Sequence, residues 1–151
     1  MKILFICTGN TCRSPMAEGL ARQILGAGIQ AESAGIAAWD GDSASAHALE
    51  VLSWKGIDLT SHRARRVTRE LLAEFDWIIP MTGDQEKRLG MMFPEFEPKI
   101  KRLGAWSSKG IHSDITDPYG GTIEVYRKSA EDIEALIQEL REHLDNQGEK
   151  R

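Results

Sequence analysis

The chain contains little cysteine: Cys7 and Cys12 are the only two in its 151 residues. Two cysteines five positions apart cannot form the framework of a disulfide-stapled secreted domain, and they suit a reducing compartment such as the cytoplasm. Long apolar runs are also missing, and none approaches the roughly 18 residues that a membrane-spanning helix needs. Met1-Lys2 leads directly into a short apolar segment, so we expect no signal peptide and no membrane association.

The chain also lacks an excess of positive charge, since its net charge is −4 at neutral pH. This charge argues against nucleic-acid binding, which depends on basic surfaces. The four histidines have no metal-ligand spacing and no nucleotide-binding glycine motif occurs, so we expect neither a metal nor a cofactor. A hydrophobic content of 41% predicts one domain over residues 1–145, followed by a polar tail at 146–151, and we expect a monomer.

Segments of strand and helix character alternate along the chain. The expected strands are 2–7, 29–34, 76–80 and 99–103; the expected helices begin at Ser14-Pro15, near Ala44, after Thr68 and after Thr82, and a last amphipathic helix includes Tyr126 to Leu144. Thr82 and Gln85 fit a capping box. This alternation predicts an α/β fold, a three-layer α/β/α sandwich with a four-stranded parallel sheet. Trp54 and Trp77 lie within apolar patterns and are expected in the core.

An octapeptide, Cys-Thr-Gly-Asn-Thr-Cys-Arg-Ser at residues 7–14, connects the first expected strand to the first expected helix. Pro15 suits the first turn of that helix, and Ser14 suits its N-cap. Gly9 and Asn10 tolerate left-handed backbone, so the loop can turn its N–H groups inward as a nest for an anion. The positive end of the helix dipole converges on the point where the strand ends.

The side chains of this loop combine a nucleophile with a phosphate-binding group. We expect Cys7 to be a thiolate at neutral pH, because the nest and the helix dipole stabilise negative charge there. Arg13 adds a planar, permanently charged fork that can bind two phosphate oxygens at once. This pairing favours attack of the sulfur on a bound phosphoryl group, and we interpret residues 7–14 as a phosphatase loop.

The octapeptide resembles the signature of the low-molecular-weight protein-tyrosine-phosphatase family, Cys-x-Gly-Asn-x-Cys-Arg-Ser-Pro, and matches it at every fixed position. Residues 32–35, 61–65 and 117–120 are also similar to family segments, so the resemblance covers nearly the whole chain. It implies that phosphorylated proteins are hydrolysed through a phosphocysteine formed on Cys7. It further implies that Asp117, followed by Pro118, is the general acid and base.

The resemblance also implies roles for residues around these catalytic groups. The residues expected to contact the phosphoryl group or the substrate are Thr8, Gly9, Asn10, Thr11, Cys12, Ser14, Trp39 and Tyr119. Among them, Trp39 and Tyr119 would be aromatic pocket walls, and Ser14 would donate its hydroxyl to the Cys7 sulfur, cap the helix, or do both. Cys12 either closes a reversible disulfide with Cys7 under oxidation or only fills space in the loop. A basic cluster forms either a solvated face or a rim that attracts acidic, phosphorylated surfaces: Arg63, Arg65, Arg66 and Arg69.

Thr11 bears on the choice of substrate. Tyrosine-specific members of the family commonly have an aliphatic residue here, which suits a phenyl ring, whereas a threonine hydroxyl can accept a hydrogen bond from a guanidinium. The protein-arginine-phosphatase branch of the family has the same octapeptide as residues 7–14, and Met81-Thr82 also resembles that branch. The resemblance therefore implies cleavage of the P–N bond of phosphoarginine in proteins, in a bacterial stress-response setting.

Three alternatives stay open. A phosphotyrosine phosphatase with an atypical loop is the nearest, because Tyr119 stands where the arginine branch can have phenylalanine. A thiol-based arsenate reductase on the same fold needs a further cysteine pair, but no cysteine follows Cys12. A non-enzymatic phospho-binding module would need neither the nucleophile Cys7 nor the proton donor Asp117.

Overall fold

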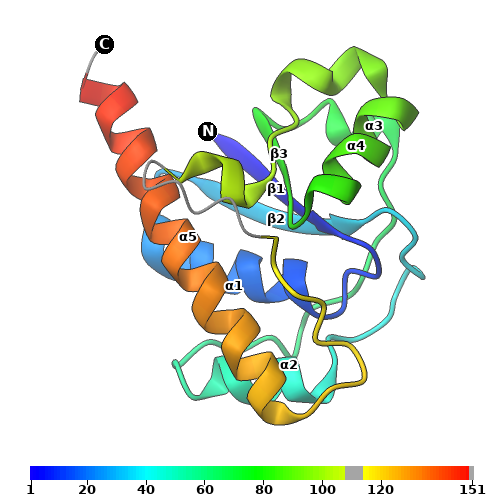
Figure 1. Ribbon diagram of the computed structural model, residues 1–151, viewed down its shortest axis with the longest axis vertical. Coiled ribbons are helices and arrows are strands. Elements are labelled where there is room, and N and C mark those ends of the chain that lie inside the picture. The colour runs from blue at the N-terminus through cyan, green and yellow to red at the C-terminus, as the bar shows by residue number, and fades with distance from the viewer. Residues whose placement is uncertain (108–113, 150–151) are drawn as a thin grey trace.

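The computed structural model describes residues 1–107 and 114–149. Three parallel strands form its sheet, β1 (Lys2–Cys7), β2 (Gln30–Gly35) and β3 (Trp77–Pro80), in the order β2-β1-β3. The apolar, β-branched residues of β1 make it the central strand, since it is covered on both faces. Figure 1 shows the sheet between two groups of helices.

The side chains of β1 alternate between two hydrophobic cores. Ile3 and Phe5 pack against α1 (Arg13–Leu25), α2 (Ala46–Ser53) and α5 (Ile123–Glu149), whereas Leu4 and Ile6 pack against α3 (Arg69–Leu72) and α4 (Gly83–Met92). Helices thus cover both faces of the sheet, and the predicted three-layer α/β/α arrangement is confirmed. Within the part of the chain described, no helix combines the length and apolar character needed to cross a membrane.

The predicted fourth strand is not a strand of the sheet. Residues 99–103 contribute one parallel bridge, in which Ile100 pairs with Ile78 and the Lys101 N–H donates to the Ile78 carbonyl at 3.0 Å. The 3₁₀ helix η1 (Pro94–Lys99) ends just before this bridge, and η2 (Leu103–Trp106) begins just after it. Only three residues are therefore left in extended conformation, which is too short for a ladder, and the sheet has three strands instead of four.

Most helix boundaries follow the predicted caps. The Thr68 hydroxyl accepts from the Leu71 N–H, and the Thr82 hydroxyl accepts from the Gln85 N–H, both at 3.1 Å. The cap predicted at Ser14 is wrong, because α1 already begins at Arg13 and Ser14 lies inside it.

The ends of two helices bear on further expectations. α5 continues to Glu149, so residues 146–149 of the predicted polar tail are helical; residues 150–151 lie outside the described part. Trp54 follows the last residue of α2 and is 55% exposed, so its predicted place in the core is wrong. Trp77 packs against the core and makes an edge-to-face contact with Trp106, as its apolar surroundings predicted.

Candidate active site

Cys7 is the last residue of the central strand β1, which has β2 on one side and β3 on the other. Crevices form at such positions, beyond the carboxyl ends of parallel strands. A cavity of about 320 Å³ lies here. Nine of the eleven residues predicted from the sequence line it: Cys7, Thr8, Gly9, Thr11, Cys12, Arg13, Trp39, Asp117 and Tyr119. The other two, Asn10 and Ser14, are buried and contact the Cys7 sulfur from the interior.

The Cys7 sulfur is surrounded by hydrogen-bond donors. Its Sγ lies 2.8 Å from the Ser14 Oγ and accepts from the Asn10 N–H at 3.3 Å. The Asn10 Nδ2 donates to the same Ser14 Oγ at 2.8 Å, which occupies a lone pair of that oxygen. The Ser14 hydroxyl proton can then point at the sulfur, which lies nearer than its other acceptor, the Ala34 carbonyl at 3.4 Å, and two donors converge on the sulfur. This arrangement stabilises a thiolate, because a charged acceptor strengthens both bonds.

Asn10 holds the loop in its left-handed turn, with φ at 56°. Its Nδ2 also donates to the Ser33 Oγ at 3.0 Å, and its Oδ1 accepts from the Arg65 N–H at 3.0 Å. His62 Nε2 lies 2.7 Å from the Asn10 carbonyl, so this nitrogen carries the proton and donates. Segments from β2 and from residues 62–65 thus fix a backbone conformation that is unfavourable for most residues.

Arg13 connects the loop to the segment that carries the predicted general acid. Its guanidinium is buried, and Nη1 donates to the Ile115 carbonyl at 3.1 Å. Its Nη2 lies 3.6 Å from the Asp117 Oδ2, and the Asp117 side chain is 56% exposed at the mouth of the cavity. The Asp117 Oδ1 accepts from the Tyr119 N–H at 3.1 Å, which fixes the turn over the cavity. The cation and the carboxylate therefore face the same space as the sulfur.

The cavity wall combines two exposed aromatic rings with residues that the sequence did not reveal. Trp39 is 79% exposed and Tyr119 is 77% exposed, yet both line the cavity, which is the geometry of pocket walls. Ala37 and Asp42 also line it and were missed. The Asp-Gly pair at residues 40–41 is a turn signal, and a turn that starts at Trp39 brings residue 42 back beside it.

Cys12 faces the cavity from the start of α1, next to Thr11. Its Sγ lies 3.4 Å from the Tyr126 Oη and donates to the Ser45 Oγ at 3.5 Å. Burial raises the pKa of Tyr126 to about 12, so its hydroxyl stays protonated beside this thiol. Cys7 and Cys12 are both free thiols, and the disulfide between them stays a prediction.

Gln85 is a further supporting residue that the sequence did not reveal. It is buried at the start of α4, and its Nε2 donates to the Thr8 Oγ1 at 3.2 Å. A capping-box glutamine bonds back to the N-cap N–H. Here its Oε1 instead accepts from the Met81 N–H at 3.0 Å, which leaves the amide free to reach the catalytic loop.

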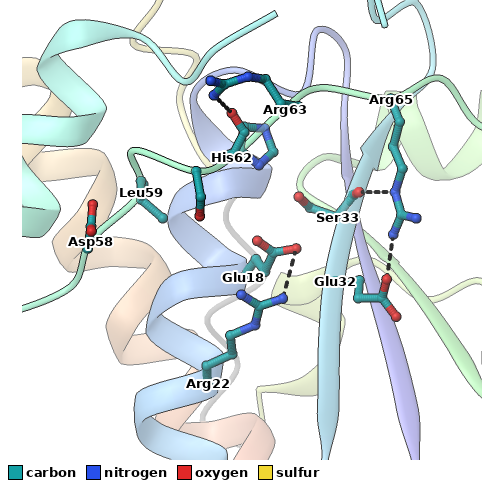
Figure 2. Close-up of a pocket in the computed structure, with 10 residues that line it drawn as sticks. Glu18, Arg22, Glu32, Ser33, Asp58, Leu59, His62, Arg63 and Arg65 are labelled. Atoms are coloured by element: carbon teal, nitrogen blue, oxygen red, sulfur yellow. Dashed lines mark hydrogen bonds and ion pairs between the residues drawn. The ribbon is translucent and has the colours of Figure 1, made fainter. Parts of the chain in front are cut away.

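A second depression of about 310 Å³ lies behind the loop, between α1, β2 and residues 58–65 (Figure 2). Burial raises the pKa of Glu18, which lies 3.6 Å from Arg22, and Ser33 donates a hydrogen bond to its carboxyl group. Arg65 pairs with Glu32 at 2.9 Å and donates to the Ser33 carbonyl. The charged side chains of this depression are thus paired or hydrogen-bonded. The depression is also lined by three residues that hydrogen-bond to Asn10, which are Ser33, His62 and Arg65.

Within residues 1–107 and 114–149, no three histidine, cysteine, aspartate or glutamate side chains lie together in a way that could hold a metal ion. His112 lies outside that part of the chain.

Comparisons with known proteins point to one family. The family model described as low molecular weight phosphotyrosine protein phosphatase matches residues 2–150. A protein-arginine-phosphatase from Geobacillus stearothermophilus is 41% identical over 149 residues, covering 97% of both chains. The solved structure of the YwlE arginine phosphatase from that organism has a TM-score of 0.93 and covers 99% of this chain and 96% of its own.

Two further solved structures bear on the chemistry. A cysteine-to-serine mutant of the YwlE arginine phosphatase, with a phosphorylated active-site serine, is 34% identical, covers 96% of both chains and has a TM-score of 0.91. A low molecular weight protein tyrosine phosphatase from T. tengcongensis is 42% identical, covers 94% of this chain and 98% of its own, and has a TM-score of 0.88.

Proposed function

The chain belongs to the low molecular weight phosphotyrosine protein phosphatase family, and from this membership we propose that it is a protein arginine phosphatase. It hydrolyses the P–N bond of phosphoarginine through a phosphocysteine on Cys7. The observation that carries the reaction is the position of the Cys7 sulfur, which has two hydrogen-bond donors at the bottom of a cavity that also contains Arg13 and Asp117.

In the first step, the Cys7 thiolate attacks phosphorus, so that an S–P bond forms and the P–N bond breaks. The loop N–H groups and the Arg13 guanidinium bind the phosphoryl oxygens, whose charge they neutralise. When Arg13 binds the phosphoryl group of the substrate, that contact would replace the 3.6 Å contact between Arg13 and Asp117. Asp117 is then available for proton transfer. Protonated Asp117 then gives its proton to the departing guanidino nitrogen, so that arginine leaves as the guanidinium cation instead of as neutral guanidine.

In the second step, water attacks the phosphocysteine. Asp117 accepts a proton from this water, an O–P bond forms, and the S–P bond breaks to give inorganic phosphate and the Cys7 thiolate. The Ser14 hydroxyl stabilises the departing sulfur, as it does the attacking one. The phosphorylated serine in the cysteine-to-serine mutant of a relative supports a covalent intermediate at this position.

Thr11 carries the assignment of the substrate. It lines the catalytic cavity, where its hydroxyl can accept from a guanidinium N–H. A phenyl ring has no such donor and would leave a polar group without a partner. The relatives named as arginine phosphatases support the same substrate.

A phosphotyrosine phosphatase is the second candidate. The 42% identity to the tyrosine phosphatase from T. tengcongensis favours it, as does the exposed ring of Tyr119 at the cavity mouth. An arsenate reductase that uses a downstream cysteine pair does not fit this chain, in which no cysteine follows Cys12.

The proposal extends to the setting of the enzyme. Its substrates are phosphorylated proteins, its location is the cytoplasm of a cell in a stress response, and it acts as a monomer that binds neither nucleic acid nor membranes. These statements rest on the family resemblance, the charge of −4 and the two unpaired cysteines.

A comparison of two substrates tests the proposed function. Peptides of identical sequence carrying either phosphoarginine or phosphotyrosine are incubated with the wild type, and released phosphate is measured. We expect a higher kcat/KM for the phosphoarginine peptide and no phosphate release by Cys7→Ser. A preference for phosphotyrosine would establish the second candidate, and release by Cys7→Ser would refute the mechanism.

A further inference from the structure

Asp42 lies in the wall of the catalytic cavity, at the end of a tight turn that begins at Trp39. The Asp42 N–H donates to the Trp39 carbonyl at 3.2 Å, and Gly41, the third residue of the turn, has φ at 95°. A positive φ at this position is what a type II turn requires, and glycine adopts it without strain. The turn therefore presents an indole ring and a carboxylate, from its first and last residues, to the same cavity.

The position of this turn is fixed by backbone hydrogen bonds to the chain around residue 64. The Ala64 N–H donates to the Asp42 carbonyl at 2.7 Å, and the Gly41 N–H donates to the Ala64 carbonyl at 2.8 Å. The Asp40 carboxylate accepts from the Arg66 N–H at 2.8 Å. Because the backbone of Asp42 is held on both sides, its side chain starts from a fixed point in the cavity wall.

The Asp42 carboxylate has no partner within residues 1–107 and 114–149: it makes neither an ion pair nor a hydrogen bond there. The other carboxylates nearby are engaged, Asp117 with Arg13 and Asp40 with the Arg66 N–H. The cavity thus has a cation at its base, where the phosphoryl group binds, and an unpaired anion with an aromatic ring on its wall. Such a charge arrangement complements a ligand that is negative at one end and positive beside it.

We propose that Asp42 is a specificity-determining residue that binds the guanidinium of phosphoarginine while Trp39 stacks against it. A guanidinium is planar, permanently charged and rich in N–H donors, so it pairs with carboxylates and stacks on aromatic faces. The phenyl ring of phosphotyrosine can stack on Trp39 but has neither charge nor donor for Asp42. This inference rests on the proposed function and adds a charge-based selection to the hydroxyl of Thr11.

The test compares Asp42→Asn with a matched control on the same turn, Asp40→Asn. Asparagine at position 40 removes one negative charge but keeps the oxygen that accepts from the Arg66 N–H. The substrates are two peptides with uncharged flanking residues that differ only in carrying phosphoarginine or phosphotyrosine. We expect Asp42→Asn to lower kcat/KM for phosphoarginine about fivefold, mainly through KM, the size expected for a solvent-accessible ion pair. Its kcat/KM for phosphotyrosine should not fall, and Asp40→Asn should leave the ratio of the two substrates as in the wild type.

Other results would overturn the inference. Equal losses on both substrates would show that Asp42 only supports the loop, and an unchanged phosphoarginine rate would show that it does not contact the guanidinium. A second peptide pair with basic flanking residues is assayed in parallel; a loss with that pair but not with the uncharged pair would assign Asp42 to the surrounding peptide instead of the guanidinium. A wild type active only on phosphotyrosine would refute the proposed function and this inference together. A wild type active on phosphoarginine, with an unchanged kcat/KM in Asp42→Asn, would refute the inference alone.

Discussion

The Ser14 hydroxyl lies 2.8 Å from the Cys7 sulfur and also accepts a hydrogen bond from the Asn10 side-chain amide. Ser14 is inside the first turn of α1, so its position depends on the helix rather than on the loop. One buried hydroxyl thereby joins the nucleophile to the network that fixes the left-handed turn at Asn10. The loss of this contact should affect reactivity more than folding.

Ser14→Ala should lower kcat about tenfold, because a hydrogen bond to a charged acceptor contributes about 1.5 kcal/mol or more. Phosphate release is measured beside Ser53→Ala, a change at the end of α2 that is remote from the loop. Wild-type rates in Ser14→Ala would contradict the role of this hydroxyl.

Gly35 allows the end of β2 to approach the catalytic loop. A Cβ at this position would lie 2.7 Å from the Thr8 carbonyl oxygen, 2.9 Å from the Ala38 Cβ and 3.0 Å from the Asn10 Cβ. Gly35→Ala should therefore displace the loop and reduce kcat/KM about 100-fold, since a shift of about 1 Å can have that effect. Gly28→Ala is the control, because nothing lies within 4 Å of its added Cβ. The kcat/KM of both variants is measured by steady-state kinetics. Full activity of Gly35→Ala would contradict the close contact between Gly35 and the loop.

Thr11→Ile should shift the preference from phosphoarginine toward phosphotyrosine peptides. Isoleucine replaces a hydroxyl acceptor in the cavity wall by an apolar surface, which suits a phenyl ring and leaves a guanidinium N–H unpaired. We expect the ratio of the two kcat/KM values to change about tenfold, as for one lost hydrogen bond to a charged group. Thr11→Ser keeps the hydroxyl and should keep the preference. The same ratio in Thr11→Ile and the wild type would refute the role of Thr11.

Glu18 gives the protein a stability that depends on pH. Burial raises the pKa of this carboxyl above its ordinary value of 4.5, so the folded state holds the proton more tightly than the unfolded state. Its stabilising contribution is complete below the unfolded value and is lost as the pH rises through the folded pKa. Glu18→Gln cannot ionise, so its unfolding free energy relative to the wild type should increase between pH 4 and pH 7.

Urea unfolding of both proteins at the two pH values measures this difference. Glu70→Gln, at an exposed position in α3, controls for the loss of one negative charge. The free energy of unfolding of Glu18→Gln minus that of the wild type should rise with pH. A difference that stays constant or falls would contradict the prediction.

Much of the fold could be predicted because its signals are local. The apolar run of β1, the caps at Thr68 and Thr82 and the stripe of α5 each lie within a few residues of the structure that they produce. The error in the sheet arose where neighbouring segments took up residues that the pattern assigned to a strand. Residues 99–103 have the composition of a strand, but flanking 3₁₀ helices leave one bridge to Ile78.

The candidate site divides in the same way. Residues 7–14 could be interpreted directly, because a nucleophile, a cation and a turn in one octapeptide must lie close together. Gln85 and Asp42 could not, since each reaches the cavity through contacts with other segments, Gln85 through Met81 and Thr8 and Asp42 through Ala64. Composition and spacing contain no record of such contacts.

The amino-acid order by itself determined the chemistry of this protein: a thiol and a guanidinium six residues apart, joined by a loop whose backbone binds anions, before the start of a helix. Six residues reach at most about 20 Å, so covalent geometry keeps these groups near one another, and a turn at Gly9-Asn10 can bring them closer. The tertiary structure alone decided what faces that volume. Trp39, Asp42 and Asp117 are separated from Cys7 by 32 to 110 positions, and only the packing of loops beyond the carboxyl ends of β1 and β2 brings them to one cavity.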